Sequence, residues 1–473
     1  MQQQSSYTEG SIIGAMVRLS LPIIMANVLQ TAYQITDTFW VGRLSAQAVA
    51  AVSLSFPVNF LLIALGGGLA LAGSILIALY KGKGDDEMMN HTAAQTLLMV
   101  MAVSVLLSGV GYVLSEPIMR VMGAAPDVLP DAVRFAQITF LGFVFVFAYF
   151  VYQSLMRGVG IVKGPMYIVL LTVILNLFLD PLFIFGYGMV PAMGVSGAAM
   201  ATLVTQAVAT AIGFALLFRG KNGFALKRVH FKPDWVFMRR AFLLGLPASI
   251  EQSTRALGMV VMTILVATFG TITIAAYGTG IRVLTFVIIP AMGLSLATST
   301  LVGQNMGAGK VERAARTNLI GTILAFTVLT AIGALLFPFA LPLTRIFIPQ
   351  GGAAIEQSAA FVRIMALTFG FIGVQQVTIG TLRGAGDTKA SMVIAVVAQW
   401  CIQFPLAYML AYHTSLGEEG LWWSFAVSNI ISATIAVLWL ARGSWKLKKL
   451  IPDEKVLKRQ VSQEALADEG IAA

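Results

Sequence analysis

The sequence contains little charge, since Asp, Glu, Lys and Arg make up only 11% of its 473 residues. Soluble proteins carry about 25% of these residues, and here 58% of the residues are hydrophobic. This composition excludes a soluble enzyme and indicates an integral membrane protein. The net charge of +10 would suggest a nucleic-acid partner for a soluble protein. Because the basic residues fall in loops between apolar segments, we relate the charge to membrane topology and expect no nucleic-acid partner.

Residues of several other kinds of site are also scarce. The single cysteine, Cys401, excludes an internal disulfide and a cysteine metal cluster. The three histidines show no metal-ligand spacing, so we expect no metal site other than one for sodium. No Walker lysine–serine pattern occurs, which argues against ATP as a partner. We expect no enzyme activity, no catalytic residue and no cofactor.

What the sequence does contain is a series of apolar segments long enough to cross a bilayer, which takes about 20 residues. We expect an all-α membrane protein with twelve spans, at residues 14–41, 47–80, 92–115, 132–156, 163–187, 195–218, 239–268, 273–305, 317–340, 358–382, 388–412 and 420–441. This pattern divides the chain into an N-terminus (1–13), a first six-helix bundle (14–218), a basic linker (219–238), a second six-helix bundle (239–441) and a charged tail (442–473).

Basic residues lie mainly in one set of alternating loops, in the linker and in the tail. Lys81, Lys83 and Lys310 belong to that set, whereas the alternate loops hold few basic residues, such as Arg43 and Arg120. Loops rich in Lys and Arg stay on the cytoplasmic side. We therefore expect a multi-pass protein of the cell (inner or plasma) membrane, with both termini and the linker in the cytoplasm.

The chain repeats itself at an offset of about 225 residues. The clearest match aligns residues 157–166 with 383–392, and another aligns 68–74 with 293–299. Each copy holds an even number of spans, so both copies begin on the same side and are related by an axis along the membrane normal. We predict two parallel six-helix bundles around a central cavity, in which rocking of one bundle against the other alternates the access.

Two aspartates in apolar spans distinguish the first copy from the second. An acid in a membrane helix costs about 2.5–3.5 kcal/mol on insertion scales, so such residues usually serve a partner or an ion path. The repeat aligns Asp37 with Met262 and Asp180 with Phe404. Because the second copy lacks both acids, the six-helix bundle as such does not require them, and we assign them to function.

Polar residues accompany these aspartates at helical spacing, which places each set on one helix face. The sets are Gln30, Tyr33, Gln34 and Asp37 in the first span, Thr172, Asn176 and Asp180 in the fifth, and Thr202 and Gln206 in the sixth. Carboxylate, amide and hydroxyl oxygens suit a hard cation such as sodium, and a pair of acids also suits a proton that both share. The alternative for the threonines and glutamines taken singly is interhelical hydrogen bonding. We predict that Gln30, Tyr33, Gln34, Thr172 and Gln206 line the substrate cavity.

Three further residues interrupt apolar spans. Pro22 removes a backbone hydrogen bond in the middle of the first span, which predicts either a hinge that responds to Asp37 or a static kink. Glu251 and Arg255 are four residues apart in the seventh span and form either a self-neutralising pair or a polar site of the second half.

These features together resemble one known family. The twelve spans in two copies, the segment 36–42 and the pair Asn176 and Asp180 are similar to the multidrug and toxic compound extrusion (MATE) family. The acidic first half is most similar to the prokaryotic branch named after the DNA-damage-inducible protein F. By position, Asp37, Asn176, Asp180 and Thr202 match the first-half cation site of that branch, which the resemblance implies binds H+ or Na+.

The resemblance implies a secondary antiporter that exports cationic amphipathic drugs or dyes in exchange for H+ or Na+. We expect a monomer embedded in the lipid bilayer. The alternative function is a flippase for lipid-linked oligosaccharides or other lipids, which a related fold performs. Such phosphate-bearing substrates favour an arginine-lined cavity, and Arg255 and Arg282 keep this alternative open.

Overall fold

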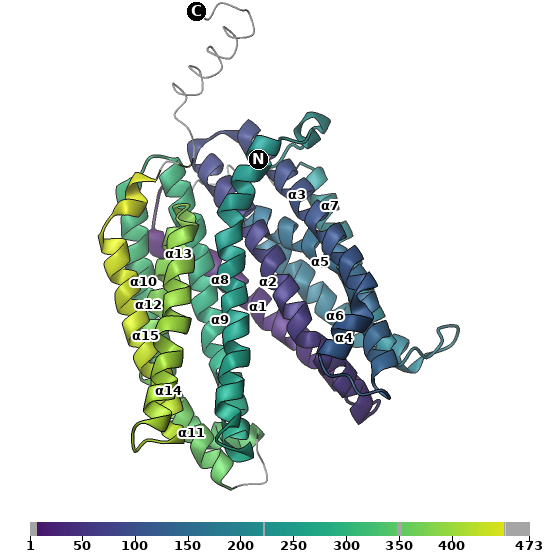
Figure 1. Cartoon of the computed structure of the whole chain (residues 1–473). Helices are drawn as coiled ribbons and strands as arrows, with labels where there is room; N and C mark the ends of the chain where they lie inside the picture. The colour runs from purple at the N-terminus through teal and green to yellow at the C-terminus, as the bar shows by residue number, and fades with distance from the viewer. Residues whose placement is uncertain (1–6, 221–222, 348–351, 449, 451–473) are drawn as a thin grey trace, which may run out of the picture.

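The computed structural model describes residues 7–220, 223–347, 352–448 and 450, and nearly all of these residues lie in helices. The described residues contain no strand apart from an isolated bridge between Tyr187 and Val190. Figure 1 shows two groups of helices, one from each half of the sequence, that converge at the end where the linker lies and diverge toward the other end. The predicted all-α membrane fold of two six-helix bundles is confirmed.

The first half comprises α1 (Ile12–Val41), α2 (Ala46–Lys83), α3 (Asp86–Val113), the short α4 (Ser115–Val121), α5 (Leu129–Val159), α6 (Lys163–Phe185) and α7 (Val195–Phe218). The second half comprises α8 (Trp235–Ala267), α9 (Thr271–Gly307), α10 (Val311–Phe347), α11 (Ala353–Ala366), α12 (Phe369–Gly384), α13 (Thr388–Val396), α14 (Phe404–Tyr412) and α15 (Glu418–Ala441). Of the predicted N-terminus and tail, residues 1–6, 449 and 451–473 lie outside the described residues.

Local signals in the sequence set many of the helix ends. The side chains of Ser11, Ser45 and Asp234 each accept a hydrogen bond from a backbone N–H in the first turn of α1, α2 and α8. Beyond α2 and α5, Gly84 and Gly160 adopt a left-handed conformation that terminates the helix. Most helices extend past the predicted spans; α8, for example, begins at Trp235 rather than at residue 239.

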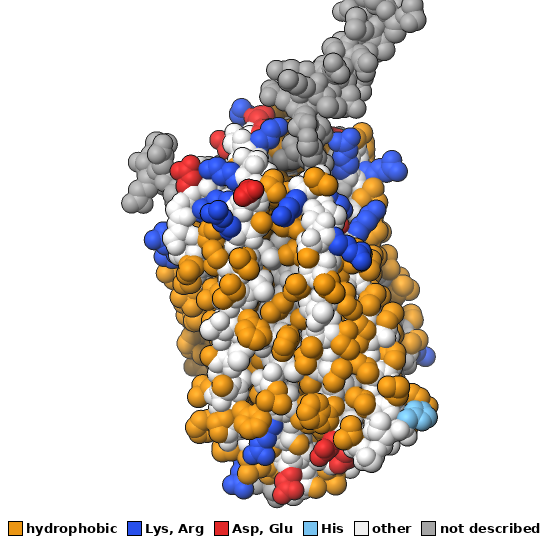
Figure 2. Space-filling view, turned by 90° about the vertical axis from the view of Figure 1, so that its left-hand side faces the viewer, with side chains coloured by type: hydrophobic (Ala, Val, Ile, Leu, Met, Phe, Trp, Pro, Cys, Tyr) orange, Lys and Arg blue, Asp and Glu red, His pale blue; other side chains and the backbone are white. Residues whose placement is uncertain are grey.

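The apolar length of the helices fits a bilayer. Eleven helices among the described residues are long and apolar enough to cross a membrane, and the pair of α11 and α12 makes a twelfth span. Figure 2 shows hydrophobic side chains over the middle of the molecule, with most Lys and Arg side chains gathered at its upper end. We call this the basic end; α2 terminates there with Lys81 and Lys83.

Two spans of the second half differ from the continuous helices that the sequence predicts. The span predicted at residues 358–382 is divided into α11 and α12, which are bent by 54°. The span predicted at 388–412 contains a π-helical segment, Val397–Gln403, between α13 and α14. This segment ends two residues before Pro405, whose ring carries no N–H for a regular helical bond. π-Helical turns shift the register of side chains and are frequent at functional sites.

The two halves pack tightly at the basic end through α2 and α9, which are equivalent helices of the repeat. A Cβ atom added to Gly82 of α2 would lie 1.9 Å from the backbone oxygen of Gln304 of α9. Reciprocally, a Cβ atom on Gly307 would lie 1.9 Å from the backbone oxygen of Leu79. Each glycine therefore allows one helix to approach the backbone of the other, and the contact closes this end of the molecule.

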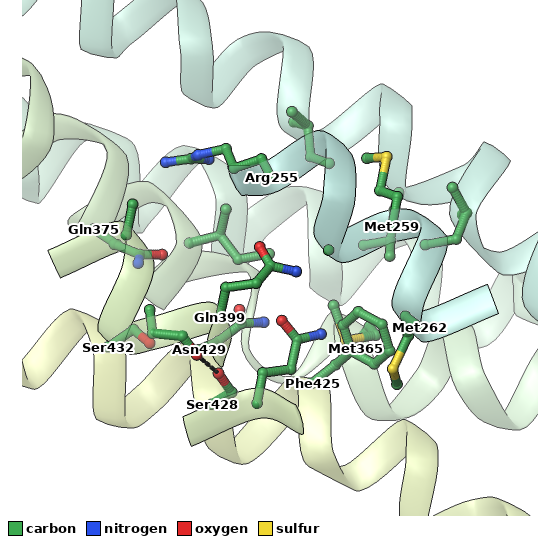
Figure 3. Close-up of a pocket in the computed structure, with 18 of the residues that line it drawn as sticks. Arg255, Met259, Met262, Met365, Gln375, Gln399, Phe425, Ser428, Asn429 and Ser432 are labelled. Carbon is green, nitrogen blue, oxygen red and sulfur yellow. Dashed lines mark hydrogen bonds between the residues drawn. The ribbon is translucent and has the colours of Figure 1, made fainter. Parts of the chain in front are cut away.

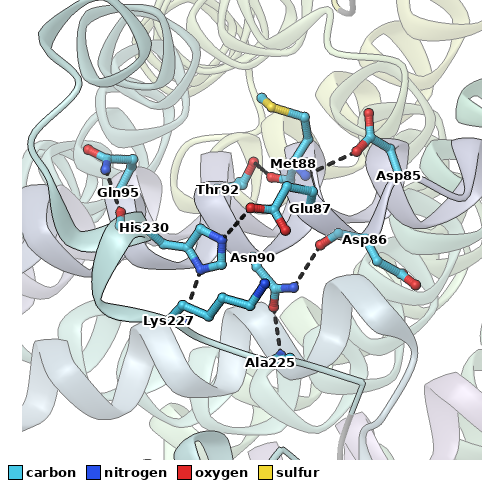
Figure 4. Close-up of polar contacts among 10 residues, drawn as sticks. All are labelled: Asp85, Asp86, Glu87, Met88, Asn90, Thr92, Gln95, Ala225, Lys227 and His230. Atoms are coloured by element: carbon cyan, nitrogen blue, oxygen red, sulfur yellow. Dashed lines mark hydrogen bonds and ion pairs between the residues drawn. The ribbon is translucent and has the colours of Figure 1, made fainter.

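The linker between the halves is docked onto the beginning of α3 (Figure 4). The Gln95 amide donates hydrogen bonds to the carbonyl oxygens of His230 (2.8 Å) and Lys232 (2.7 Å), and its oxygen accepts one from the N–H of Asp234 (3.0 Å). The buried His230 ring contacts the Glu87 carboxylate at 2.8 Å. These bonds hold the start of α8 against the first half.

Candidate functional site

The predicted cation site lies where α1, α6 and α7 meet, at the end of the bundle opposite the basic end. α1 packs along α6, and both begin at the basic end. Asp37 and Asp180 therefore lie close to the far ends of these helices, within about two turns at 3.6 residues per turn. Their order along the helices places both acids where the two halves diverge.

Asn176 and Asp180 form a buried pair on one face of α6. Both side chains are 0% exposed, and the Asn176 amide donates a hydrogen bond of 2.8 Å to Oδ1 of Asp180. This bond is the contact that the four-residue spacing predicts. It satisfies one carboxylate oxygen only, because Oδ2 of Asp180 is buried without a hydrogen-bond partner among the described residues.

Asp37 faces this pair from α1. Asp37 lies four residues before the end of α1 and Asp180 five residues before the end of α6, on two helices that pack together, and the Asp37 side chain is partly exposed. Its Oδ1 atom and the Oδ1 atom of Asn176 are also buried without a hydrogen-bond partner in the described part of the chain. Two carboxylates and an amide thus leave three acceptor oxygens unsatisfied in an apolar environment, an arrangement that fits a proton or a hard monovalent cation.

Tyr33 connects α1 to α7. Its hydroxyl lies 3.2 Å from Oγ1 of Thr202 and 2.8 Å from Oγ1 of Thr205. Tyr33 and Thr205 are buried, and Thr205 is bonded in turn to the carbonyl oxygen of Thr202. Thr202 is therefore linked through Tyr33 to the helix that carries Asp37, and Thr205 is a site residue that the sequence reasoning missed.

The other predicted cavity residues lie in different environments. Thr172 is buried and donates to the carbonyl oxygen of Val169 in its own helix (2.7 Å), and Gln206 is 9% exposed on α7. Gln30 and Gln34 are exposed on α1. Their roles in substrate binding stay predictions.

Pro22 lies inside α1, which continues as one helix from Ile12 to Val41. Next to it, Met16, Leu19 and Ile23 pack with residues of the second half such as Leu294 and Ala297. The first part of α1 is thus held by the other half, whereas the part that carries Asp37 packs against α6. The hinge at Pro22 stays a prediction.

Glu251 and Arg255 form the predicted ion pair, and the structure adds a third member. Oε1 of Glu251 lies 3.1 Å from Arg255 and 2.8 Å from Arg383 of α12. Glu251 is 0% exposed, and Arg255 also donates to Oε1 of Gln376 (3.0 Å). The buried carboxylate therefore holds two cations from α8 and α12 together.

We expect Glu251→Ala to lower the free energy of unfolding by about 3–5 kcal/mol, because it leaves Arg383 buried without its carboxylate. The double variant Glu251→Gln/Arg383→Gln should recover part of this loss. The control is Glu116→Ala, which removes an exposed pair of the same spacing with Arg120 and should cost less than about 1 kcal/mol. Thermal unfolding of the purified protein in detergent measures all three, and equal losses for Glu116→Ala and Glu251→Ala contradict the interpretation.

The second half contains a cavity of about 190 Å³, lined by apolar side chains and a group of amides, that the sequence reasoning did not identify. Figure 3 shows the Gln399 side chain in the middle of this cavity, near Arg255 and Asn429. A Cβ atom on Gly258 would lie 2.2 Å from the Gln399 amide nitrogen, so this glycine provides the space that Gln399 occupies. The described lining also includes Gln375, Gln376, Gln403, Ser428, Ser432 and three methionines, and it contains no carboxylate.

Part of this cavity was recognisable in the sequence. Gln399 and Gln403 are four residues apart in an apolar span, the same spacing that led to Asn176 and Asp180. No acid accompanies the two glutamines. The convergence of α8, α9, α12 and α15 on them depends on tertiary packing, so it was not visible in the spacing.

Comparison with known proteins identifies the family. The MatE family model matches residues 22–182 and 247–409, one match in each half of the repeat. The chain belongs to the MatE family. The two matches coincide with the internal duplication, and they cover Asp37, Asn176 and Asp180 in the first half.

Relatives of this MatE protein are described as multidrug resistance proteins or as transporters. The probable multidrug resistance protein YpnP of Bacillus subtilis is 27% identical over 95% of this chain and 99% of its own length. A protein of Shewanella oneidensis described as an FAD transporter is 26% identical over 93% of this chain and 97% of its own. The solved structure of a multidrug resistance MATE family transporter in an outward-facing conformation matches with a TM-score of 0.88 and 26% identity, covering 95% of this chain and all of that one. This MatE protein is accordingly a multi-pass membrane transporter of the multidrug efflux type.

Proposed function

We propose that this MatE protein is a secondary antiporter that exports cationic amphipathic compounds in exchange for incoming H+ or Na+. The observation that carries the proposal is the set of unsatisfied oxygens on Asp37, Asn176 and Asp180 in one buried place between α1 and α6. A cation or proton bound there neutralises charge that is costly in an apolar environment. The basic end is cytoplasmic in this proposal, because Lys and Arg are retained on that side of the membrane.

The position of the acids fits ion entry from outside. Asp37 and Asp180 lie toward the end that we assign to the external side, and the opposite end is closed by the contact of α2 with α9. An external ion can reach the acids in this arrangement, bind between α1 and α6, and favour release of the exported compound. One elementary charge that crosses 100 mV contributes about 2.3 kcal/mol, which is enough to drive accumulation.

The test is efflux of ethidium, a cationic planar dye, from proteoliposomes with an imposed pH gradient or an imposed Na+ gradient. We expect one of the two gradients to accelerate efflux, and collapse of that gradient by an ionophore to remove the acceleration. Efflux that is independent of both gradients contradicts antiport. The same vesicles with labelled lipid measure flipping, which we expect to be absent.

The cavity of the second half favours a second candidate, export of small aromatic anions. Arg255 lines this cavity, and because its partner Glu251 is shared with Arg383, the three side chains together carry one net positive charge. The described lining has no carboxylate, and a volume of about 190 Å³ accommodates one or two rings. A relative described as an FAD transporter shows that the family name alone does not imply cationic cargo. If this second candidate is correct, the protein transports salicylate, which is an aromatic carboxylate.

If the second candidate is correct, Arg255→Gln lowers salicylate transport about tenfold and leaves ethidium efflux unchanged, because it removes the cation beside the ligand. Arg255→Lys is the matched control, since it keeps the charge and should keep most of the transport. Uptake of radiolabelled salicylate into inside-out vesicles measures both variants. Equal transport by Arg255→Gln and the unmodified protein contradicts this candidate.

A further inference from the structure

A second cavity lies at the basic end, and it shares no lining residue with the cavity of the second half described above. Its volume of about 340 Å³ falls in the range of about 300–1,000 Å³ that is typical of ligand sites. It is formed by α2 and the start of α8, by the turn between α12 and α13, and by residues 448 and 450 that follow α15. Neither the ion site nor the ion pairs of Glu251 involve these residues.

The cavity has an excess of positive charge. Arg240, Lys389 and Lys448 line it, and Lys448 contacts the Asp387 carboxylate at 2.6 Å. Arg240 and Lys389 are exposed and have no ion-pair partner in the part of the chain that the structure describes. Two unpaired cations from different helices therefore face one cavity, which favours an anionic ligand.

Three leucines of the lining lie deeper along the helices than its cations. Leu243 and Leu244 follow Arg240 by about one turn of α8, on the side away from the basic end. Leu76 lies at a similar depth on α2, before Lys81 and Lys83. A ligand that fills this cavity thus meets cations at its outer end and aliphatic side chains at its inner end. A free phosphate has no group for the inner end, whereas a phospholipid has acyl chains.

We propose that this cavity binds an anionic phospholipid, with the phosphate of its headgroup between Arg240 and Lys389 and its acyl chains along Leu243 and Leu244. Basic sites between membrane helices on the cytoplasmic side are suited to such headgroups. The proposal rests on the orientation given under the proposed function, since the basic end must lie in the cytoplasmic leaflet. It does not depend on the coupling ion or on the exported compound.

The bound lipid also connects the two halves. α2 belongs to the first half, whereas Arg240 and Lys389 belong to the second. Separation of α2 from α8 at the basic end takes this cavity apart, so the lipid stabilises the arrangement in which the basic end is closed.

The experiment measures binding of phosphatidylglycerol to the purified full-length protein in neutral detergent, by native mass spectrometry and by the rise in Tm on titration. Phosphatidylcholine and inorganic phosphate are the comparison ligands. We expect phosphatidylglycerol alone to bind and to raise the Tm. The variant Arg240→Gln/Lys389→Gln should weaken this binding about 30-fold, since each cation near a membrane surface contributes about 1 kcal/mol of attraction to anionic lipid.

The matched control is Arg219→Gln/Arg228→Gln, which removes two exposed cations at the same end of the molecule but outside the cavity. It should bind phosphatidylglycerol like the unmodified protein, as should the charge-conserving Arg240→Lys/Lys389→Arg. Equal loss in both glutamine variants, equal binding of phosphatidylcholine, or competition by millimolar inorganic phosphate overturns the proposal. Because these readouts do not involve transport, failure of the antiport proposal leaves them interpretable.

Discussion

Asp180→Asn is expected to abolish the effect of the ion gradient on dye efflux, with a loss of at least about 100-fold in gradient-driven rate, while the protein stays folded. Asparagine has the shape of the aspartate, so the contact with Asn176 at 2.8 Å can be kept. What is lost is the charge that a proton or a sodium ion neutralises. We expect the same result for Asp37→Asn, because each acid contributes one of the unsatisfied oxygens.

The same variants should leave the Tm unchanged or raise it, since a buried charge with an unsatisfied oxygen is replaced by a neutral amide. This separates loss of coupling from loss of fold. Asp131→Asn is the matched control, because Asp131 is an exposed acid at the start of α5, at the same end of the molecule. Full gradient-driven efflux by both Asp37→Asn and Asp180→Asn would falsify the assignment of the ion site.

Gly82→Ala or Gly307→Ala is expected to reduce the transport rate about 5- to 150-fold. Each added methyl would lie 1.9 Å from a backbone oxygen of the opposite helix, so α2 and α9 must move apart. Overpacking of this kind costs about 1–3 kcal/mol, and that energy corresponds to the stated shift in a conformational equilibrium. The arrangement in which the basic end is closed is then less populated. Because the transport cycle passes through this arrangement, transport slows.

The matched control for this prediction is Gly278→Ala in the same helix α9. A Cβ atom there meets nothing within 4 Å, so transport should be unchanged. Spin labels are attached to cysteines at Lys83→Cys and Arg316→Cys, in a Cys401→Ser background. The distance between the two labels should be longer when the protein also carries Gly82→Ala than when it carries Gly278→Ala. An unchanged distance together with normal transport contradicts the role of these glycines in closing the basic end.

The spans and the Asn176–Asp180 contact were predictable because both depend on near neighbours in the chain. Hydropathy over about 20 residues identifies a helix that crosses a bilayer, and a spacing of four residues places two side chains on one helix face. The bend between α11 and α12 was not predictable in this way. Leu367 and Thr368 separate these helices without a glycine or proline to mark the break.

Contacts between segments far apart in the chain could not be predicted from hydropathy or from helical spacing. Arg383 meets Glu251 across two helices of the second half, and Tyr33 meets Thr205 across two helices of the first. The spacing of residues along one helix says which side chains share a face but not which helix covers that face. For the same reason Gln30 and Gln34 share helical spacing with Asp37 in the sequence, yet they are exposed in the structure.

The sequence by itself determined the membrane class, the twelve spans, the duplication and the two acids that only the first copy carries, because composition and periodicity are properties of the chain alone. The tertiary structure decided which oxygens remain unsatisfied, where the amide cavity of the second half lies, and how closely Gly82 and Gly307 bring α2 and α9 together. These features arise from the packing of helices far apart in the chain, and that packing depends on the shapes of whole helix surfaces.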